Sequence, residues 1–145
     1  MESVKEPLPV PMMTLLTREF WESAKKGKLV FQHCSKCDLL QAYPKPCCSE
    51  CGSETLSWKE LSGEGTVYSF TIPRQVVDNS PAFKEQLPFV VAVVQLKEGP
   101  RLITNIVDVP PEEVKIGMEV RATFEDVSPE IALPKFRPVH PLSKR

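Results

Sequence analysis

Two pairs of cysteines constrain the fold of this chain more than any other feature. They are Cys34 and Cys37, then Cys48 and Cys51, two C-x2-C pairs with ten residues between them. Each C-x2-C turn brings two thiolates to one side of a tight loop, and two facing turns offer the four sulfurs of a tetrahedral site that suits Zn²⁺. Because the protein fills all four positions, no activated water remains and the expected role is structural. The spacing therefore predicts one zinc ion per chain that folds residues 28–60, a stretch too short to build a core alone.

Two alternatives to zinc stay open at this stage. Iron can occupy the same four-sulfur cage, as in a rubredoxin, and ligand type does not separate the two metals well. A redox-active disulfide is the other alternative. The fifth cysteine, Cys47, cannot replace Cys48 without breaking the two-residue spacing to Cys51, so we interpret it as a neighbour that points away from the metal. A catalytic role for Cys47 would need a nearby base, and the chain has only His33 and His140.

Charge and hydropathy exclude several classes of protein. Lys and Arg total 18 against 19 Asp and Glu, so with a net charge of −1 there is no overall basic field and any phosphate site must be local. The longest apolar run, residues 89–94, is far shorter than the roughly 18–20 residues that a membrane span needs. The amino terminus lacks the charged start and apolar run of a signal peptide, so we expect a cytoplasmic protein. Fifteen prolines against six glycines favour short strands and fixed turns over long helices.

The rest of the pattern is mainly β, with one short helix. Apolar residues spaced four apart, followed by Gly27, predict a helix over 17–26. Beyond Gly63, apolar and polar residues alternate or form short apolar runs, which predicts strands. The predicted strands cover residues 67–72, 89–96, 101–107, 118–125 and 131–139, of which the second and third form a hairpin.

Five short strands suit a small, partly open Greek-key barrel of the OB type. The cysteine module precedes this barrel, and a helix precedes the module. The expected organisation is an arm and helix (1–27), the cysteine module (28–60), the barrel (61–138) and a tail (139–145).

Several separate motifs occur here in the order typical of one known family. Besides the cysteine pairs they are Phe20-Trp21, Gly27-Lys28-Leu29, Tyr43-Pro44, Cys51-Gly52-Ser53, Trp58, Ser62-Gly63-Glu64-Gly65-Thr66-Val67-Tyr68-Ser69, Glu98-Gly99-Pro100-Arg101, Ile116-Gly117-Met118-Glu119-Val120 and Leu133-Pro134-Lys135-Phe136-Arg137-Pro138. On these motifs the chain resembles, from about residue 15 to Pro138, the acyl-CoA-associated OB-fold proteins, family thirty-five of the domains of unknown function. One departure is Asp38, where the family often has a glycine, and this strains the turn slightly without removing a ligand.

The resemblance implies a helical segment, a rubredoxin-like zinc ribbon and a carboxy-terminal OB-fold, in proteins that accompany thiolases and other acyl-CoA enzymes. In archaeal relatives the partners look like acetoacetyl-CoA thiolase and hydroxymethylglutaryl-CoA synthase, at the entry to isoprenoid synthesis through the mevalonate pathway, with the small protein as a scaffold between them. A non-catalytic role agrees with the sequence, which has no Ser/His/Asp set and no complete glycine-rich phosphate loop. We interpret Gly63-Glu64-Gly65 as a hinge, because a strand follows it instead of a helix.

A site for coenzyme A would need two or three Arg or Lys donors for the phosphates and an apolar groove for the pantetheine. The candidates are Arg74, Arg101, Lys135 and Arg137. Arg74 is expected at the end of the first barrel strand, and Lys135 and Arg137 share one face of the last strand by period two. The alternative is that these are solvated charges at strand ends, which normally face water.

Aromatic residues suggest two further roles. Trp21 and Trp58 are candidates for docking to a partner, because aromatic residues anchor interfaces, although Trp21 could equally pack on the barrel of its own chain. The alternative function is a binder of single-stranded nucleic acid, in which Tyr68 and Phe70 would stack on bases. The net charge of −1 disfavours it, because the attraction to phosphates would be weak.

Overall fold

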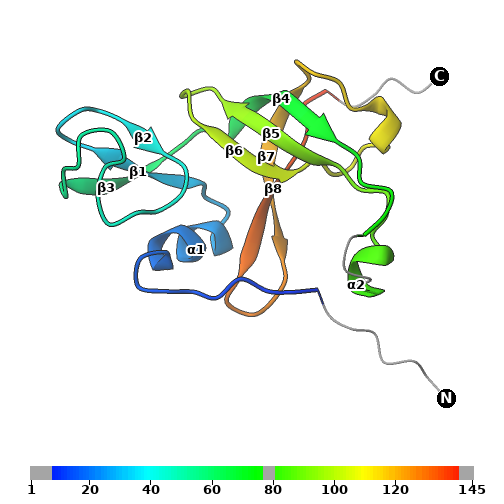
Figure 1. The fold of residues 1–145 in the computed structure, drawn as a ribbon, viewed down its shortest axis with the longest axis horizontal. Helices are drawn as coiled ribbons and strands as arrows, with labels where there is room; N and C mark the ends of the chain where they lie inside the picture. Colours follow the sequence, from blue (N-terminus) through cyan, green and yellow to red (C-terminus); the bar gives the residue numbers. More distant parts are fainter. Residues whose placement is uncertain (1–7, 77–80, 141–145) are drawn as a thin grey trace.

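The computed structural model describes residues 8–76 and 81–140, which form two antiparallel β-sheets and a few short helices (Figure 1). The smaller sheet has the strand order β2-β1-β3, and the larger one has the order β6-β5-β4-β7-β8. The strands are β1 (Val30–Cys34), β2 (Leu40–Gln41), β3 (Leu56–Glu60), β4 (Glu64–Thr71), β5 (Val91–Leu96), β6 (Arg101–Asn105), β7 (Glu119–Asp126) and β8 (Ala132–Pro138). The helices are α1 (Arg18–Lys25), α2 (Pro81–Lys84) and a short 3-10 helix, η1 (Pro111–Glu113). The predicted fold class, mainly β with a short amino-terminal helix, is confirmed.

The five-stranded sheet curls into a partly open barrel, as the sequence predicted. Its two edge strands, β6 and β8, meet at one end through a parallel bridge between Ile106 and Phe136. There the N–H of Val107 donates to the carbonyl of Phe136 at 2.8 Å, and the hydroxyl of Thr104 donates to the carbonyl of Pro134 at 3.0 Å. Helix α1 lies against this barrel and contacts β8 and β7 as well as β1 of the smaller sheet (Figure 1).

Helix α1 falls within the predicted range, and Gly27, with a φ of 80°, follows its end. Thr17 occupies the N-cap position without capping the helix through its side chain, because its hydroxyl accepts the N–H of Thr14 at 3.0 Å instead. Within the described residues, no helix has the length and apolar character that crossing a membrane requires.

The segment interpreted as a hinge, Gly63-Glu64-Gly65, is instead largely strand. Glu64 and Gly65 belong to β4, and Gly65 pairs with Val120 of β7 and Leu96 of β5. A Cβ on Gly65 would lie 2.6 Å from the carbonyl oxygen of Gln95, which is too close for any side chain. Glycine is therefore needed here for the close approach of β4 to β5, and the hinge interpretation is wrong.

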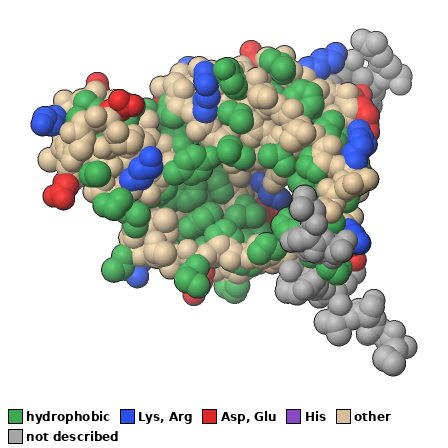
Figure 2. Space-filling view, in the orientation of Figure 1, with side chains coloured by type: hydrophobic (Ala, Val, Ile, Leu, Met, Phe, Trp, Pro, Cys, Tyr) green, Lys and Arg blue, Asp and Glu red, His purple; other side chains and the backbone are tan. Residues whose placement is uncertain are grey.

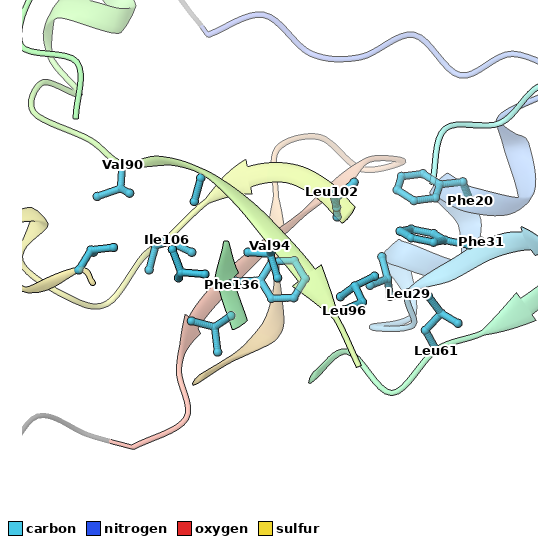
Figure 3. Packing of buried hydrophobic residues seen from close by; sticks show 14 residues of the cluster. Phe20, Leu29, Phe31, Leu61, Val90, Val94, Leu96, Leu102, Ile106 and Phe136 are labelled. Carbon is cyan, nitrogen blue, oxygen red and sulfur yellow. The ribbon is translucent and has the colours of Figure 1, made fainter. Parts of the chain in front are cut away.

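One hydrophobic core joins the smaller sheet to the barrel. Phe31 on β1 packs in the same cluster as Phe20 of α1 and Leu61, the first residue after β3. Figure 3 shows this group beside Leu96, which comes from the barrel. Phe136 and the central barrel strands continue the cluster on the other side. The two sheets are thus parts of one packed body.

Candidate functional site

The four paired cysteines converge at the tip of the smaller sheet. Their sulfur atoms all lie within 4.8 Å of one another. Two of these distances join one pair to the other, with 3.6 Å from Cys34 to Cys51 and 3.5 Å from Cys37 to Cys48. A tetrahedral metal with bonds of about 2.3 Å to sulfur has edges of about 3.8 Å. The residues therefore fit a four-thiolate metal ion, and the exposed Cys47 lies outside the cluster.

The two cysteine turns have the same backbone geometry. In the first, the N–H of Cys34 donates to the carbonyl of Leu39 at 2.9 Å, and the N–H of Asp38 donates to the carbonyl of Cys34 at 2.8 Å. The second turn repeats this pattern, with the N–H of Gly52 donating to the carbonyl of Cys48 at 3.0 Å. Asp38 and Gly52 occupy equivalent positions, with φ angles of 70° and 74°. The turn thus requires a left-handed residue, which is the reason that a glycine is favoured there.

We expect the substitution Asp38→Gly to raise the free energy of unfolding of the metal-loaded protein by about 1 kcal/mol, since a left-handed conformation costs a non-glycine residue about that much. The gain is reduced by loss of the contact between the Asp38 carboxylate and the His33 ring. Asp38→Ala, which loses the same contact without relieving the backbone, serves as the control and should be less stable than the wild type. Thermal unfolding measures both, and equal stability of the Gly and Ala variants would contradict the backbone argument.

Hydrogen bonds from backbone amides shift the pKa values of the thiols in the cluster. A hydrogen bond from the backbone of Cys51 lowers the pKa of Cys48 to about 6, against the effect of burial. The backbone of Cys37 likewise lowers the pKa of Cys34. At Cys37 the backbone of Leu39 lowers the pKa, but hydrogen bonding with the Cys48 thiol, together with burial, raises it to about 12 overall. Because metal ligands must be thiolates, binding a cation expels the proton of Cys37, and the metal affinity rises with pH.

A second feature is an apolar groove of about 410 Å³ at the junction of α1, the smaller sheet and the barrel. Figure 2 shows it as a hollow lined by hydrophobic side chains near the centre of this face. Its apolar walls are Phe20, Trp21, Ala42, Tyr43, Pro44, Leu102, Ile103, Leu133 and Pro134. The hydroxyl of Tyr43 accepts the N–H of Ile103 at 3.0 Å, which joins the loop after β2 to the edge of the barrel.

The two tryptophans have different surroundings. Trp21 lines the groove and meets the ring of Phe20 edge-on, with 4.9 Å between the ring centroids. Trp58 lies half-buried on β3 and packs against the shared core instead of lining the groove. Both stay candidates for docking to a partner, but only Trp21 belongs to the groove. Sequence reasoning missed Tyr43 and Ile103 as groove residues.

The four candidate phosphate ligands do not form one cluster. Lys135 lines the groove, but its ammonium pairs at 2.7 Å with Glu125 of the neighbouring strand, which lines a separate hollow of about 200 Å³ and not the groove. Arg101 stacks over the ring of Tyr68 at 3.8 Å. Arg137 lines a different hollow, of about 540 Å³, on another part of the barrel. These three cations are therefore spread over separate places.

Arg74 lies apart from the other candidates. Strand β4 ends at Thr71, so the prediction that Arg74 ends this strand is wrong. The intervening Pro73 has no N–H to donate to a neighbouring strand, which explains why pairing stops early. Arg74 is instead an exposed residue of the loop that follows.

Both histidine rings of the chain contact a carboxylate. The ring of His33 contacts the Asp38 carboxylate, and the ring of His140 lies 2.9 Å from a carboxylate oxygen of Glu119. Over residues 8–76 and 81–140, the cysteine cluster is the one group of three or more His, Cys, Asp or Glu side chains placed to hold a metal.

Comparison with known proteins agrees with this architecture. The model of the ChsH2 rubredoxin-like zinc ribbon domain matches residues 21–57, and the model of the ChsH2 C-terminal OB-fold domain matches residues 58–125. A DUF35 domain-containing scaffold protein of Pyrococcus furiosus is 39% identical over 104 residues, which cover 70% of this chain and 72% of that protein. The chain belongs to the DUF35 family. The predicted module limits at residues 60 and 61 stay predictions, since the two matched models meet within β3 of this DUF35 protein.

Other relatives of this DUF35 chain are larger or belong to complexes. A probable enoyl-CoA hydratase alpha subunit of Thermomonospora curvata is 43% identical over 123 residues, or 84% of this chain, but the chain spans only 37% of that subunit's length. Among solved structures, the Ltp2-ChsH2(DUF35) aldolase matches with a TM-score of 0.78 and 39% identity, covering 90% of this chain and all of that one.

Proposed function

We propose that this DUF35 chain is a non-catalytic accessory subunit that binds an acyl-CoA enzyme and uses a structural zinc to hold its ribbon. The apolar groove is the observation that carries the proposal. Its rim includes Ile103, which is 62% exposed although it lies beside Trp21 and Tyr43. Exposed aliphatic and aromatic side chains around a concave surface are typical of protein interfaces.

The relatives support a partner of this class. Three archaeal relatives are called scaffold proteins, and one bacterial relative is called an enoyl-CoA hydratase alpha subunit. The aldolase structure carries the names of two proteins, Ltp2 and ChsH2. We propose a thiolase-type enzyme as the partner at the groove. A bridge between acetoacetyl-CoA thiolase and hydroxymethylglutaryl-CoA synthase would require a second contact surface in addition to this one.

We propose that the phosphates of coenzyme A contact this chain only at isolated Lys or Arg side chains, and not at a complete phosphate site. Lys135 stands at the groove, but Glu125 already neutralises its charge. Arg101, Arg137 and Arg74 lie elsewhere on the surface. A complete phosphate site normally needs two or three converging donors, so the partner enzyme would supply most of them.

Zinc is the metal that we propose for the cysteine cluster. The four sulfurs have the separation that a tetrahedral ion needs, and the matched family model is a zinc ribbon. A closed four-thiolate site contributes folding free energy and leaves no position for substrate. Elemental analysis of the purified protein tests this assignment: one zinc per chain supports it, and iron contradicts it.

We expect Ile103→Glu to weaken capture of the partner at least tenfold, because a carboxylate would be desolvated in the apolar groove. Ile116→Glu is the matched control: Ile116 is 71% exposed and does not line the groove. The tagged variants are compared in pull-downs from nuclease-treated lysate, with proteins identified by mass spectrometry and the affinity then measured on the purified partner. Recovery of an acyl-CoA enzyme that depends on Ile103 supports the proposal. Equal recovery by both variants, or recovery of nucleic-acid-binding proteins instead, contradicts it.

A further inference from the structure

Two glutamines are buried inside the smaller sheet, which is unusual for so polar a side chain. Gln32 on β1 is 5% exposed and Gln41 on β2 is 7% exposed, and the two residues lie directly opposite each other in the sheet. A buried amide group that lacks hydrogen bonds is destabilising. The hydrogen-bond partners of the two glutamine side chains therefore indicate the role of these residues.

The hydrogen bonds of this pair lead to the loop that enters the second cysteine turn. The side chain of Gln32 forms two hydrogen bonds with the backbone of Lys45, donating to its carbonyl at 3.0 Å and accepting its N–H at 2.9 Å. Gln41 donates to the side-chain oxygen of Gln32 at 2.7 Å and to the carbonyl of Cys47 at 3.3 Å, and it accepts the N–H of Ser49 at 3.1 Å. The two side chains thus bind alternate backbone positions, 45, 47 and 49, as a neighbouring strand would.

The second cysteine turn depends on these contacts more than the first. Cys34 is the last residue of β1, so sheet pairing with β3 fixes the position of the first turn. Cys48 instead follows a loop, residues 42–47, that belongs to neither sheet and contains two prolines, Pro44 and Pro46. The residues on either side of Cys48, at positions 47 and 49, are held by Gln41.

We infer that Gln32 and Gln41 are positioning residues for the metal centre: they hold the loop 45–49 so that Cys48 and Cys51 face the first cysteine pair before a metal ion arrives. This inference rests on the proposed zinc site. Groups that hold metal ligands in place without contacting the ion raise the metal affinity, because less of the chain has to be ordered when the ion binds. Loss of such a partner typically lowers the affinity roughly 10–100-fold.

The test uses the full chain with Gln41→Met and Gln32→Met, since methionine preserves the size of the side chain and removes its hydrogen bonds. Gln41→Asn, which retains the amide but shortens its reach, is the second variant in case the first does not fold. Val30→Ala is the matched control, because Val30 is buried on β1 and its apolar side chain cannot form a hydrogen bond with the loop. The readouts are zinc affinity by chelator competition, the rate of zinc release, the absorption spectrum with Co²⁺, and amide exchange at Ser49.

Gln41→Met is expected to lower the zinc affinity roughly 10–100-fold, to release zinc faster and to expose the Ser49 amide to exchange. Val30→Ala should lower the melting temperature without changing the Co²⁺ spectrum or the protection of Ser49. The rates of zinc release of Gln41→Met and Val30→Ala are compared after allowing for the loss of melting temperature that each substitution causes. Equal rates in this comparison would overturn the inference. A wild-type protein that binds neither zinc nor Co²⁺ would instead overturn the proposed metal site itself, so the two failures are distinguishable.

Discussion

Replacement of Cys37 by serine should abolish tight zinc binding and unfold the ribbon. Structural zinc in small domains contributes an apparent free energy of about 10–16 kcal/mol, which is more than a three-stranded sheet of this size can replace by packing. Amide exchange followed by mass spectrometry measures the effect, with the amides of β1 and β3 expected to lose their protection. Elemental analysis of the same sample gives the metal content.

Cys47→Ser is the matched control for this experiment. Cys47 is likewise a cysteine, and it lies in the loop that enters the second cysteine turn, but its exposed thiol lies outside the four-sulfur cluster. Its replacement should leave both the zinc content and the exchange protection unchanged. Unaltered protection of β1 in the metal-free Cys37→Ser protein would show that the ribbon folds without its ion, against the structural role.

The cysteine cluster could be predicted from the sequence because its geometry is local. A C-x2-C turn is closed by hydrogen bonds between residues four and five apart, such as those from Asp38 to Cys34 and from Cys34 to Leu39. Slight strain at Asp38 was expected only from the resemblance, in which a glycine is frequent at this position, and the structure gives its cause as a φ of 70°. The positioning glutamines were not visible, since Gln32 and Gln41 stand out from other polar residues only once the loop 45–49 is seen to fold over them.

The groove could not be predicted, because its walls come from segments far apart in the chain. Trp21, Tyr43, Ile103 and Leu133 meet only after the helix, the ribbon and both edges of the barrel have packed together. No local sequence pattern around these residues indicates that they share one surface. The surroundings of the basic residues could not be predicted either, because they also depend on segments far apart in the chain.

Two of the basic residues interact with side chains from other strands of the same sheet. Lys135 pairs with Glu125 across two neighbouring strands, and Arg101 stacks on Tyr68 from two strands away. Period two placed Lys135 and Arg137 correctly on one strand, but alternation says nothing about what lies beside it. The sequence grouped as candidates for one site cations that line different hollows of the fold, and their contact with coenzyme A stays a prediction.

The substitution Phe31→Ala tests whether the ribbon and the barrel depend on each other. Phe31 is fully buried in the core shared with Phe20 and Leu61, so we expect its loss to lower the free energy of unfolding by about 3–5 kcal/mol. Val30→Ala, on the neighbouring position of β1, removes a buried side chain that lies outside this shared cluster. Urea unfolding gives the free energies, and amide exchange at Val94 of β5 reports on the barrel.

Phe31→Ala should lower the protection of both the ribbon and Val94, whereas Val30→Ala should affect the ribbon alone. A barrel that keeps its full stability in the Phe31 variant would mean that the two parts are energetically independent. If they are coupled, zinc stabilises more than the ribbon: the hydrogen bond from Ile103 to Tyr43 spans the same junction. Loss of the metal would then also remove one wall of the groove, and binding of a partner there would depend on zinc even without contact between the partner and the ion.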